Sequence, residues 1–488
     1  MAFSTSFPTT SIPTLPLLSL SEDEKALIIQ LRQRYQRNAA AMKLCDLYYR
    51  GEQVIKNLRI AVPAELEGHL RTLVGWAAMA VDPYVERLNV DCFRQVEATD
   101  GDEYLMAMME ANGFASEQSL AYTDALSMGP AYWAVGSPAT PGDAPVVTVE
   151  SPLNCAVLWD LRGTTARAMM QEYWSEDGRH RGALLVPGKT VHLAQDDAGQ
   201  WVVSNRDEHD FDFVPVVRMA NRARTNNRSG SSEITPALQS IIDEACRTLL
   251  ALAVARELYS VPQKAILGAA ESAFQKADGT QASTLETYIT KVLGLERDEN
   301  GELPQLHQFT AYDPSVFTKI LDWFASSASG IVAATPQDLG LYTQGNPASA
   351  EAGLIADDRR NRRARRMQRA FTPALIDVAK MMVRFDNKGR LPAEYERLAV
   401  DWSPVEMQAP GLLSDAVTKE IAAGAVPPTS DVTLKRLGYN AVDRQRLAQD
   451  RREDDSRQMA LALAQGLLPQ QPTRQTATGA TGGDAAGL

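Results

Sequence analysis

Residues 313–347 read DPSVFTKILDWFASSASGIVAATPQDLGLYTQGNP, a stretch that begins and ends with a helix-start signal. The first signal is Asp313-Pro314, the second is Asn346-Pro347, and a third, Thr235-Pro236, lies upstream. In each pair the first residue can accept a free backbone N–H, and proline fits the first helical position because its missing N–H costs nothing there. We therefore expect three long helices, at residues 234–259, 314–335 and 347–385.

The segments between these helices differ in length and character. Residues 263–312 separate the first helix from the second, and their turn signals Asp278-Gly279 and Asn300-Gly301 predict a small lobe. A short loop rich in Gly, Gln and Asn joins the second helix to the third. Pro373 predicts a kink inside the third helix. This order of helix, lobe, helix, loop and helix suits a wall better than an enclosed pocket.

The composition is that of an ordinary globular protein of 488 residues, 44% hydrophobic and 23% charged. The net charge of −12 argues against general adhesion to nucleic acid, although DNA can pass nearby without binding. The cysteines stand singly in the sequence, which argues against a disulfide framework or a zinc site and favours a reducing cytosol. They are Cys45, Cys92, Cys155 and Cys246.

No segment has the pattern of a targeting or membrane sequence. Residues 1–21 read as a flexible arm without Lys or Arg, unlike a signal peptide. The longest apolar run, residues 249–255, is far shorter than the roughly twenty residues that span a bilayer. We expect a soluble protein with no membrane partner, and a disordered tail at residues 469–488.

The rest of the chain divides into helical and strand-like parts. Apolar residues at helical spacing predict further helices at residues 22–57, 65–86 and 102–128, with Pro83 kinking or ending the second. Between Ala131 and Met219, short β-branched and aromatic runs separated by turn residues predict an antiparallel meander. Beyond them we expect a strand near Trp402 and short helices at residues 414–423, 430–437 and 441–467. The predicted fold class is α+β, mainly α.

Two short motifs have a chemical interpretation that their context weakens. Gly188-Lys189-Thr190 resembles a phosphate-binding loop, but Gly182 is one residue too far upstream and Val191-His192-Leu193 predicts a strand where the motif needs a helix. A hairpin turn is the preferred interpretation. Asp207-Glu208-His209-Asp210 could be drawn as metal ligands, but neighbouring side chains cannot all point at one ion, so a solvated turn before a strand is preferred.

The histidines offer no catalytic or metal-binding arrangement. All five stand singly, at His69, His180, His192, His209 and His307. We therefore predict a protein that is not an enzyme, with no catalytic residues, no metal and no cofactor.

One dense basic run stands out in this acidic chain. It consists of Arg359, Arg360, Arg362, Arg363, Arg365, Arg366 and Arg369. The run has three interpretations: a solvated helix with i,i+4 pairs to Asp357 and Asp358, contacts to acidic residues of a neighbouring subunit, or direct contact with DNA. We favour the second, because one short helix cannot easily supply seven arginines with counter-charges.

The order of elements resembles the portal proteins of tailed bacteriophages, in the branch of the gp6-like portals of siphophages. The resemblance covers nearly all of residues 22–465 and is carried by fragments whose order and spacing are specific together. Early fragments are Leu47-Tyr48-Tyr49-Arg50-Gly51, Val74-Gly75-Trp76, Val81 to Leu88, and Phe93-Arg94. Middle fragments are Val214 to Val217, Asn221-Arg222, Gly230 to Ile234, and Ile242 to Ala245. Late fragments are Asn346 to Ala352, Trp402, Ala422 to Val426, and Leu437-Gly438.

The resemblance implies a portal architecture that forms a ring. Its parts, in chain order, are an N-terminal arm (1–21), a wing of helices and the β meander (22–232), a stem helix (233–262), a small α/β clip (263–312), a second stem helix (313–336), a tunnel loop (337–346), a long kinked helix returning to the wing (347–411), a helical crown (412–468) and the tail (469–488). The resemblance also implies that residues of the tunnel loop line the DNA channel. These residues are Gln337, Asp338, Leu339, Tyr342, Thr343, Gln344 and Asn346.

The resemblance also implies a function and partners. It predicts a dodecameric ring at one capsid vertex that conducts double-stranded DNA during packaging and ejection. Expected partners are the large terminase, a head-completion or adaptor protein and the major capsid protein, with the scaffold protein as a further candidate. The protein would assemble in the host cytoplasm and reside in the virion. Two alternatives are another structural head component, minor capsid or adaptor, without a channel, and a nucleotide hydrolase using Gly188-Lys189-Thr190.

Overall fold

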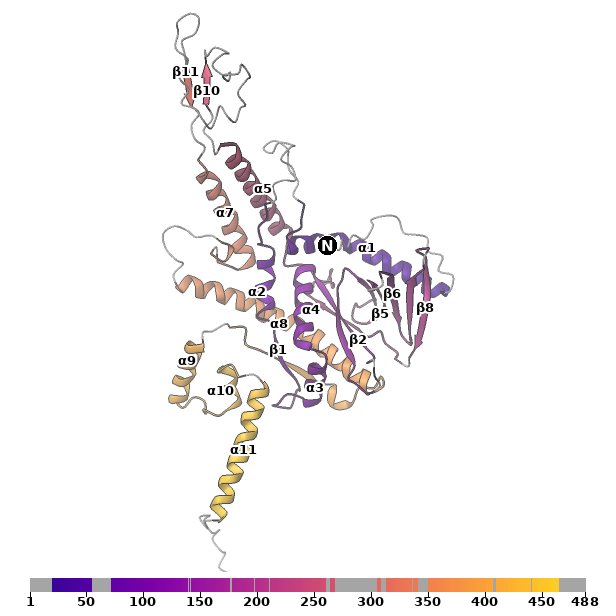
Figure 1. The fold of residues 1–488 in the computed structure, drawn as a ribbon. Helices are drawn as coiled ribbons and strands as arrows, with labels where there is room; N and C mark the ends of the chain where they lie inside the picture. Colours follow the sequence, from indigo (N-terminus) through magenta and orange to yellow (C-terminus); the bar gives the residue numbers. More distant parts are fainter. Residues whose placement is uncertain are drawn as a thin grey trace, which may run out of the picture. The chain divides into compact units, whose positions relative to one another are not determined.

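The longest described element of the computed structural model is helix α8 (Ala350–Asp386), which has 37 residues (Figure 1). The structure describes residues 20–54, 72–259, 264–267, 305–308, 313–335, 337–340, 350–406, 410–439 and 441–464, without positions 139, 141, 176–177, 197 and 210. The chain separates into two compact units, Met1–Met407 and Gln408–Leu488. The expected third helix is therefore present, although its predicted start at Asn346-Pro347 lies outside the described residues.

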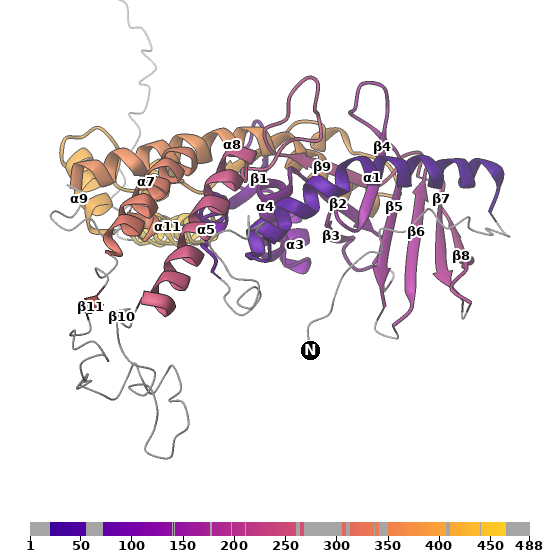
Figure 2. The same cartoon turned by 90° about the horizontal axis from the view of Figure 1, so that it is seen from above.

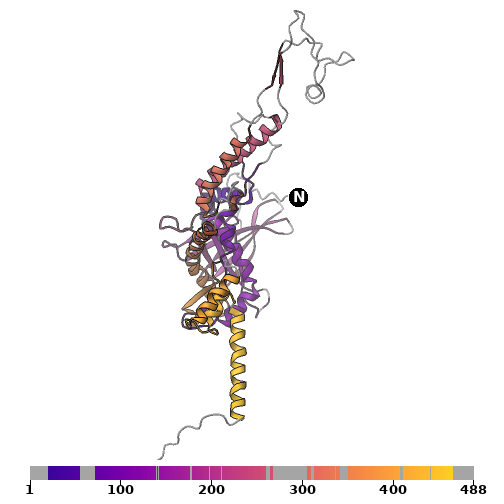
Figure 3. The same cartoon turned by 90° about the vertical axis from the view of Figure 1, so that its left-hand side faces the viewer.

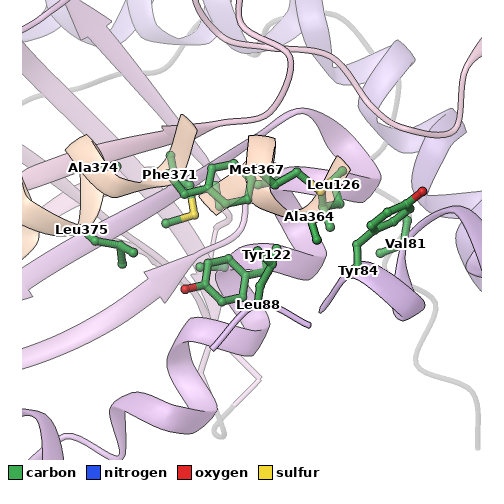
Figure 4. Close-up of a cluster of buried hydrophobic side chains, with 14 of the residues drawn as sticks. Val81, Tyr84, Leu88, Tyr122, Leu126, Ala364, Met367, Phe371, Ala374 and Leu375 are labelled. Atoms are coloured by element: carbon green, nitrogen blue, oxygen red, sulfur yellow. The ribbon is translucent and has the colours of Figure 1, made fainter. Parts of the chain in front are cut away.

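One face of α8 lies in the main hydrophobic core of the first unit. Its buried residues recur at helical spacing and are Ala364, Met367, Phe371, Ala374, Leu375, Val378, Ala379, Met382 and Val383. The Phe371 ring stacks on that of Tyr122, with centroids 5.7 Å apart and planes 11° apart (Figure 4). Pro373 lies on the exposed side, and the helix continues through it.

The N-terminal helix, α1 (Glu22–Arg50), begins with reciprocal hydrogen bonds between Ser21 and Glu24 and ends at Gly51, whose φ is 65°. The prediction that this helix continues to residue 57 is wrong, because the left-handed glycine ends it. The helix lies across a five-stranded sheet (Figure 2) and buries Ile28 and Leu31 against it. The Glu24 carboxylate is 3% exposed and binds two strand cations, Lys189 at 2.7 Å and Arg206 at 2.6 Å.

The predicted antiparallel meander is confirmed. The five-stranded sheet has the order β4-β5-β6-β7-β8 and a three-stranded sheet has the order β3-β2-β9. Their strands are β2 (Pro130–Gly136), β3 (Val146–Glu150), β4 (Cys155–Trp159), β5 (Ala166–Trp174), β6 (His180–Val186), β7 (Lys189–Gln195), β8 (Trp201–Glu208) and β9 (Val216–Ala220).

Within the meander, the structure confirms one interpretation of a short motif and corrects another. Gly188 (φ 80°) lies in the turn between β6 and β7, and Lys189 begins a strand, so the hairpin is confirmed and the phosphate-loop geometry is absent there. Asp207 and Glu208 belong to the end of β8 rather than to a turn before a strand, and the Asp207 carboxylate binds His192 Nε2 at 2.7 Å.

Two predicted helices are broken. The one expected at residues 102–128 is α3 (Glu103–Ala111) followed by α4 (Phe114–Met128), because Gly113 adopts φ 56° between them. The one expected at residues 65–86 is described only from residue 72, where it consists of a 3-10 turn, η2 (Ala78–Ala80), and a short helix, α2 (Asp82–Val85). Pro83 lies in the first turn of α2 rather than kinking or ending a helix, a position that suits its missing N–H.

Helices α5 (Pro236–Tyr259) and α7 (Ser315–Val332) lie side by side (Figure 1). The Thr235 hydroxyl accepts the Leu238 N–H at 3.3 Å, and the Asp313 carboxylate accepts the Ser315 N–H at 2.9 Å. The predicted cap at Thr235 is confirmed. The predicted cap at Asp313 is wrong, because Pro314 occupies the N-cap position of α7 without a side-chain cap, and the helix begins at Ser315, one residue later than expected. Of residues 263–312, the structure describes one antiparallel pair, β10 (Lys264–Leu267) with β11 (Gln305–Gln308).

The first unit is completed by a two-stranded sheet, β1 (Val90–Gln95) with β12 (Leu398–Trp402), and the 3-10 turns η4 (Gln337–Leu339) and η5 (Ala393–Tyr395). The strand expected near Trp402 is thus confirmed. The second unit contains α9 (Pro410–Ala422), α10 (Asp431–Arg436) and α11 (Ala441–Ala464), close to the three predicted helices. Figure 3 shows α11 as one uninterrupted helix.

Candidate functional site

The C-terminal end of α7 presents backbone carbonyls that no residue of the same helix can satisfy. The helix ends because Ala333 adopts a left-handed conformation, with φ 57°, a strained choice for a residue other than glycine. Ala333 is fully buried. A buried helix end of this kind needs hydrogen-bond donors from elsewhere in the fold.

Side chains from α8 and α2 supply these donors. Arg359 donates to the Gly330 carbonyl at 3.3 Å, Arg363 to the Ile331 carbonyl at 2.7 Å and Arg360 to the Ala333 carbonyl at 3.1 Å. The Tyr84 hydroxyl donates to the Val332 carbonyl at 2.8 Å. Four consecutive carbonyls are therefore capped, and three guanidinium groups lie where the helix dipole favours positive charge.

We call Arg359, Arg360 and Arg363 the inner arginines, because all three contact the end of α7. A second set, Arg362, Arg366 and Arg369, has the i, i+4, i+7 spacing of a neighbouring face and is exposed; we call these the outer arginines. Arg362 pairs with Asp358 at 2.8 Å. Arg366 and Arg369 have no hydrogen bond or ion pair within the described part of the chain.

The inner arginines correct an assumption made from the sequence. We expected one short helix to supply too few counter-charges and therefore favoured a neighbouring subunit, but backbone carbonyls and carboxylates from this helix and other segments of the same chain engage five of the seven. Arg360 also pairs with Asp338 and, at 3.5 Å, with Asp357, and Arg365 pairs with Glu406. The i,i+4 pair Arg362–Asp358 follows the solvated-helix interpretation. Arg366 and Arg369 are exposed and keep their guanidinium groups available for an intermolecular contact.

Two aromatic residues also donate hydrogen bonds to the end of α7 and to the segment that follows it. Tyr84 is 1% exposed, and burial raises the pKa of its hydroxyl, which keeps the group a hydrogen-bond donor. The Trp76 indole N–H donates to the Leu339 carbonyl at 3.3 Å. Sequence reasoning missed this role, although both residues belong to the quoted fragments. A signal was available, since aromatic residues with a polar tip inside an apolar run often reach a buried acceptor.

The start of the predicted tunnel loop is held by the same network. The Asp338 carboxylate accepts the Thr335 N–H at 2.7 Å, while the Asp338 N–H donates to the Thr335 hydroxyl at 3.3 Å. Burial alone would raise the pKa of Asp338, but these hydrogen bonds and the Arg360 guanidinium hold it below its ordinary value. Leu339 is buried. The structure thus places Asp338 and Leu339 against their own chain.

The other loop residues singled out from the sequence lie beyond what the structure describes. They are Tyr342, Thr343, Gln344, Asn346 and the side chain of Gln337. The position of the loop in a channel stays a prediction.

Helix α7 has two different apolar faces. Ala325, Ala328 and Val332 are buried, and these small residues belong to the core that α5 shares. Val316, Ile320 and Trp323 follow at i, i+4, i+7 spacing and are 51%, 40% and 65% exposed. We call these three residues the outer stripe of α7. These side chains leave an apolar row accessible to solvent on a helix whose other face is already packed.

The described residues offer neither a metal-binding cluster nor a helix that could span a membrane. They contain no group of three or more His, Cys, Asp or Glu side chains placed to hold a metal ion. None of the helices, over the residues that are described, is both long and apolar enough to cross a bilayer.

Comparison with known proteins gives matches over most of the chain. Residues 29–438 match the family model described as "Phage portal protein, SPP1 Gp6-like". The portal protein of Mycobacterium phage D29 is 29% identical over 434 residues, which cover 87% of this chain and 88% of that protein. The portal protein of Mycobacterium phage L5 is 28% identical over 471 residues, covering 94% and 95%.

Among solved structures, a chain in the neck of a native gene transfer agent particle aligns with a TM-score of 0.40 at 16% identity, covering 82% of this chain and 98% of that chain. This likeness is too low to carry an argument. The family match, by contrast, spans both the α5–α7 pair and the arginine junction. The chain therefore belongs to the family of phage portal proteins, which are structural proteins of the phage head.

Proposed function

We propose that this chain is the subunit of a dodecameric ring at one capsid vertex, through which double-stranded DNA passes during packaging and ejection. The observation that carries the proposal is the family match over residues 29–438. In a closed ring, one face of each subunit meets a different face of the next. The proposal therefore requires surfaces on this chain that are exposed in the monomer and suited to burial.

The outer stripe of α7 supports such a contact. Its three apolar side chains lie on the face that the α5 contact leaves open, and Trp323 alone is 65% exposed. Under the proposal, α5 and α7 are the stem helices, and the outer stripe packs on the stem of a neighbouring subunit. Burial of this stripe would contribute about 25 cal/mol for each Å² of apolar surface removed from water.

The outer arginines supply a second contact under the proposal. We assign Arg362, Arg366 and Arg369 to carboxylates of a neighbouring subunit rather than to DNA. The chain carries 61 acidic against 49 basic residues, so a neighbouring copy offers carboxylates. A channel wall that bound phosphates strongly would hold the duplex and hinder its movement, because phosphate contacts dominate affinity for DNA. We expect a mainly acidic channel, with the loop at residues 337–346 closest to the duplex.

The remaining parts are assigned by family resemblance. The clip at residues 263–312 would bind the large terminase during packaging and a head-completion or adaptor protein afterwards. The wing and the crown at residues 412–468 would face the major capsid protein and, during assembly, a scaffold protein. The residues assigned to the crown all belong to the second compact unit, Gln408–Leu488. The energy for packaging would come from a partner, with this chain binding no cofactor.

Electron microscopy of the purified protein tests the proposal. We expect rings with a central hole, and Trp323→Ser should reduce the fraction of ringed particles. Trp174→Ser is a matched control, because Trp174 is 64% exposed but lies on strand β5. A compact monomer at all concentrations, or assemblies without a hole, would favour the alternative of a head component without a DNA channel.

A further inference from the structure

A cavity of about 650 Å³ opens on the C-terminal half of α8, away from the arginine junction. Its walls are the hairpin between β4 and β5, strand β9 with the segment that follows it, and α8 from Ala370 to Arg384. None of the features described above uses this cavity. Its size is that of a site for a small ligand or for a few side chains of another protein.

The lining of the cavity is strongly cationic in an acidic protein. Five basic side chains face one acidic side chain, Asp377; the basic ones are Arg218, Arg224, Arg228, Lys380 and Arg384. The local balance is therefore +5 − 1 = +4, against −12 for the whole chain. Such a concentration of one sign in a concave surface attracts the opposite charge.

Two of these cations are already engaged and shape the walls. The Arg218 guanidinium lies over the Trp159 ring, 4.3 Å from its centroid, and donates to the Gly163 carbonyl at 2.8 Å. The Arg384 guanidinium lies 4.1 Å from the centroid of Phe213 and pairs with Asp212 at 3.5 Å. These contacts make the walls rigid and partly apolar.

The other cations remain available. Arg224 and Arg228 are exposed and have no ion pair among the described residues, and Lys380 has only the nearby Asp377. Leu161, in the hairpin that forms one wall, is also fully exposed. Cations that can make bidentate contacts, placed beside apolar surface, match a segment that carries both carboxylate and apolar side chains.

A concave site fits a peptide better than a duplex. A DNA duplex carries its phosphates on the outside of a wide rod, which cannot enter a cavity of about 650 Å³. A few protruding side chains of a protein can enter it. A second copy of this chain is the nearest source of carboxylates, since acidic residues exceed basic ones by 61 − 49 = 12. We infer that this cavity binds an acidic segment of a neighbouring copy of this chain. The inference rests on the proposed ring.

A charge-reversal pair tests the energetics of this contact. Arg224→Glu with Arg228→Glu should raise the protein concentration needed for half-maximal assembly, measured by mass photometry, by about tenfold or more, and the difference should shrink at high salt. Arg224→Gln with Arg228→Gln should have a smaller effect in the same direction. The matched control makes the same charge change at two exposed arginines outside the cavity, Arg37→Glu with Arg452→Glu, and should leave the midpoint within about twofold. An unchanged midpoint for the Glu pair would overturn the inference.

Photo-crosslinking then identifies the occupant. A photoreactive amino acid in place of Thr225, which lines the cavity, should crosslink to an acidic peptide of another copy, identified by mass spectrometry of mixed light and heavy protein. Normal rings that crosslink at this position only to DNA, to a different head protein, or within one copy would overturn the inference and leave the proposed ring intact. A protein that never self-associates would contradict both.

Discussion

The inner and outer arginines of α8 belong to one run of seven but have opposite environments. Arg359, Arg360 and Arg363 contact carbonyls at the end of α7, whereas Arg366 and Arg369 project from the described structure without a partner. The difference arises largely from position along the helix, because Arg366 and Arg369 lie about one and about two turns of α8 beyond Arg363. The comparison teaches that a basic run can serve stability on one face while its other face remains available for a partner.

The largest expected effect on the free energy of unfolding comes from the apolar core against which α8 packs. Phe371→Ala should lower the free energy of unfolding by about 3–5 kcal/mol, because it removes a buried ring and leaves a cavity beside Tyr122. Equilibrium denaturation in urea measures the change. Leu375→Met keeps the volume nearly constant and should cost less than about 1.5 kcal/mol. Equal effects from the two substitutions would show that α8 is not packed as described.

The ion pairs of Glu24, in another part of the first unit, should make a contribution to the free energy of unfolding that depends on pH. The Arg206 and Lys189 side chains outweigh the cost of burial and lower the pKa of Glu24 from 4.5 to about 2. A lowered carboxyl pKa contributes stability above pH 4.5 that is lost as the pH falls toward 2. Glu24→Gln should therefore cost about 2–3 kcal/mol at pH 7 and flatten the loss of stability between pH 5 and 2. A pH profile identical to that of the parent protein would contradict this assignment.

The inner arginines should behave differently, because backbone carbonyls do not titrate. Arg363→Ala should cost about 1.5–3 kcal/mol, the range for a hydrogen bond that involves a charged group. The cost should be similar at pH 7 and pH 5, in contrast to Glu24→Gln. Arg363→Lys is the control, since an ammonium group can keep one of the hydrogen bonds and should restore part of the loss. If Arg363→Ala lowers the free energy of unfolding by less than about 0.5 kcal/mol, Arg363 does not stabilise the protein by capping α7.

The outer arginines should have the smallest effect on stability. Arg366→Ala and Arg369→Ala each remove an exposed side chain without a partner in the described chain, so the change should stay within about 0.5 kcal/mol. Thermal and urea denaturation of the unassembled protein provide the measurement. A loss as large as that of Arg363→Ala would mean that the two faces do not differ in this way.

Sequence patterns predicted the features that depend on local chemistry. The cap at Thr235, the meander and the hairpin at Gly188 follow from a few adjacent residues, and the structure confirms them. The break at Gly113 was missed because apolar spacing continues across it, while the backbone conformation that interrupts the helix is not visible in a periodicity. The short α2 was missed for a similar reason, since the apolar spacing also continues across residues 72–86, where the structure has only short helical turns.

The arginine run shows where such reasoning fails for a site. The sequence reveals seven positive charges and invites a search for carboxylates, yet three of the arginines bind backbone carbonyls. Carbonyl acceptors exist at every residue, and only the three-dimensional ending of α7 selects Gly330, Ile331 and Ala333. Family resemblance supplied the order of the elements, but the division of the run into two faces required the structure.

Charge reversal of the outer arginines, compared with truncation of an inner arginine, tests the central claim most directly. Particle mass and melting temperature would be measured together for Arg366→Glu with Arg369→Glu and, separately, for Arg363→Ala. We predict that the outer pair prevents ring formation with an unchanged melting temperature, whereas Arg363→Ala lowers the melting temperature of the subunit while rings still form at low temperature. Intact rings from the outer pair, together with a loss of DNA packaging, would assign the outer face to DNA and contradict the subunit contact.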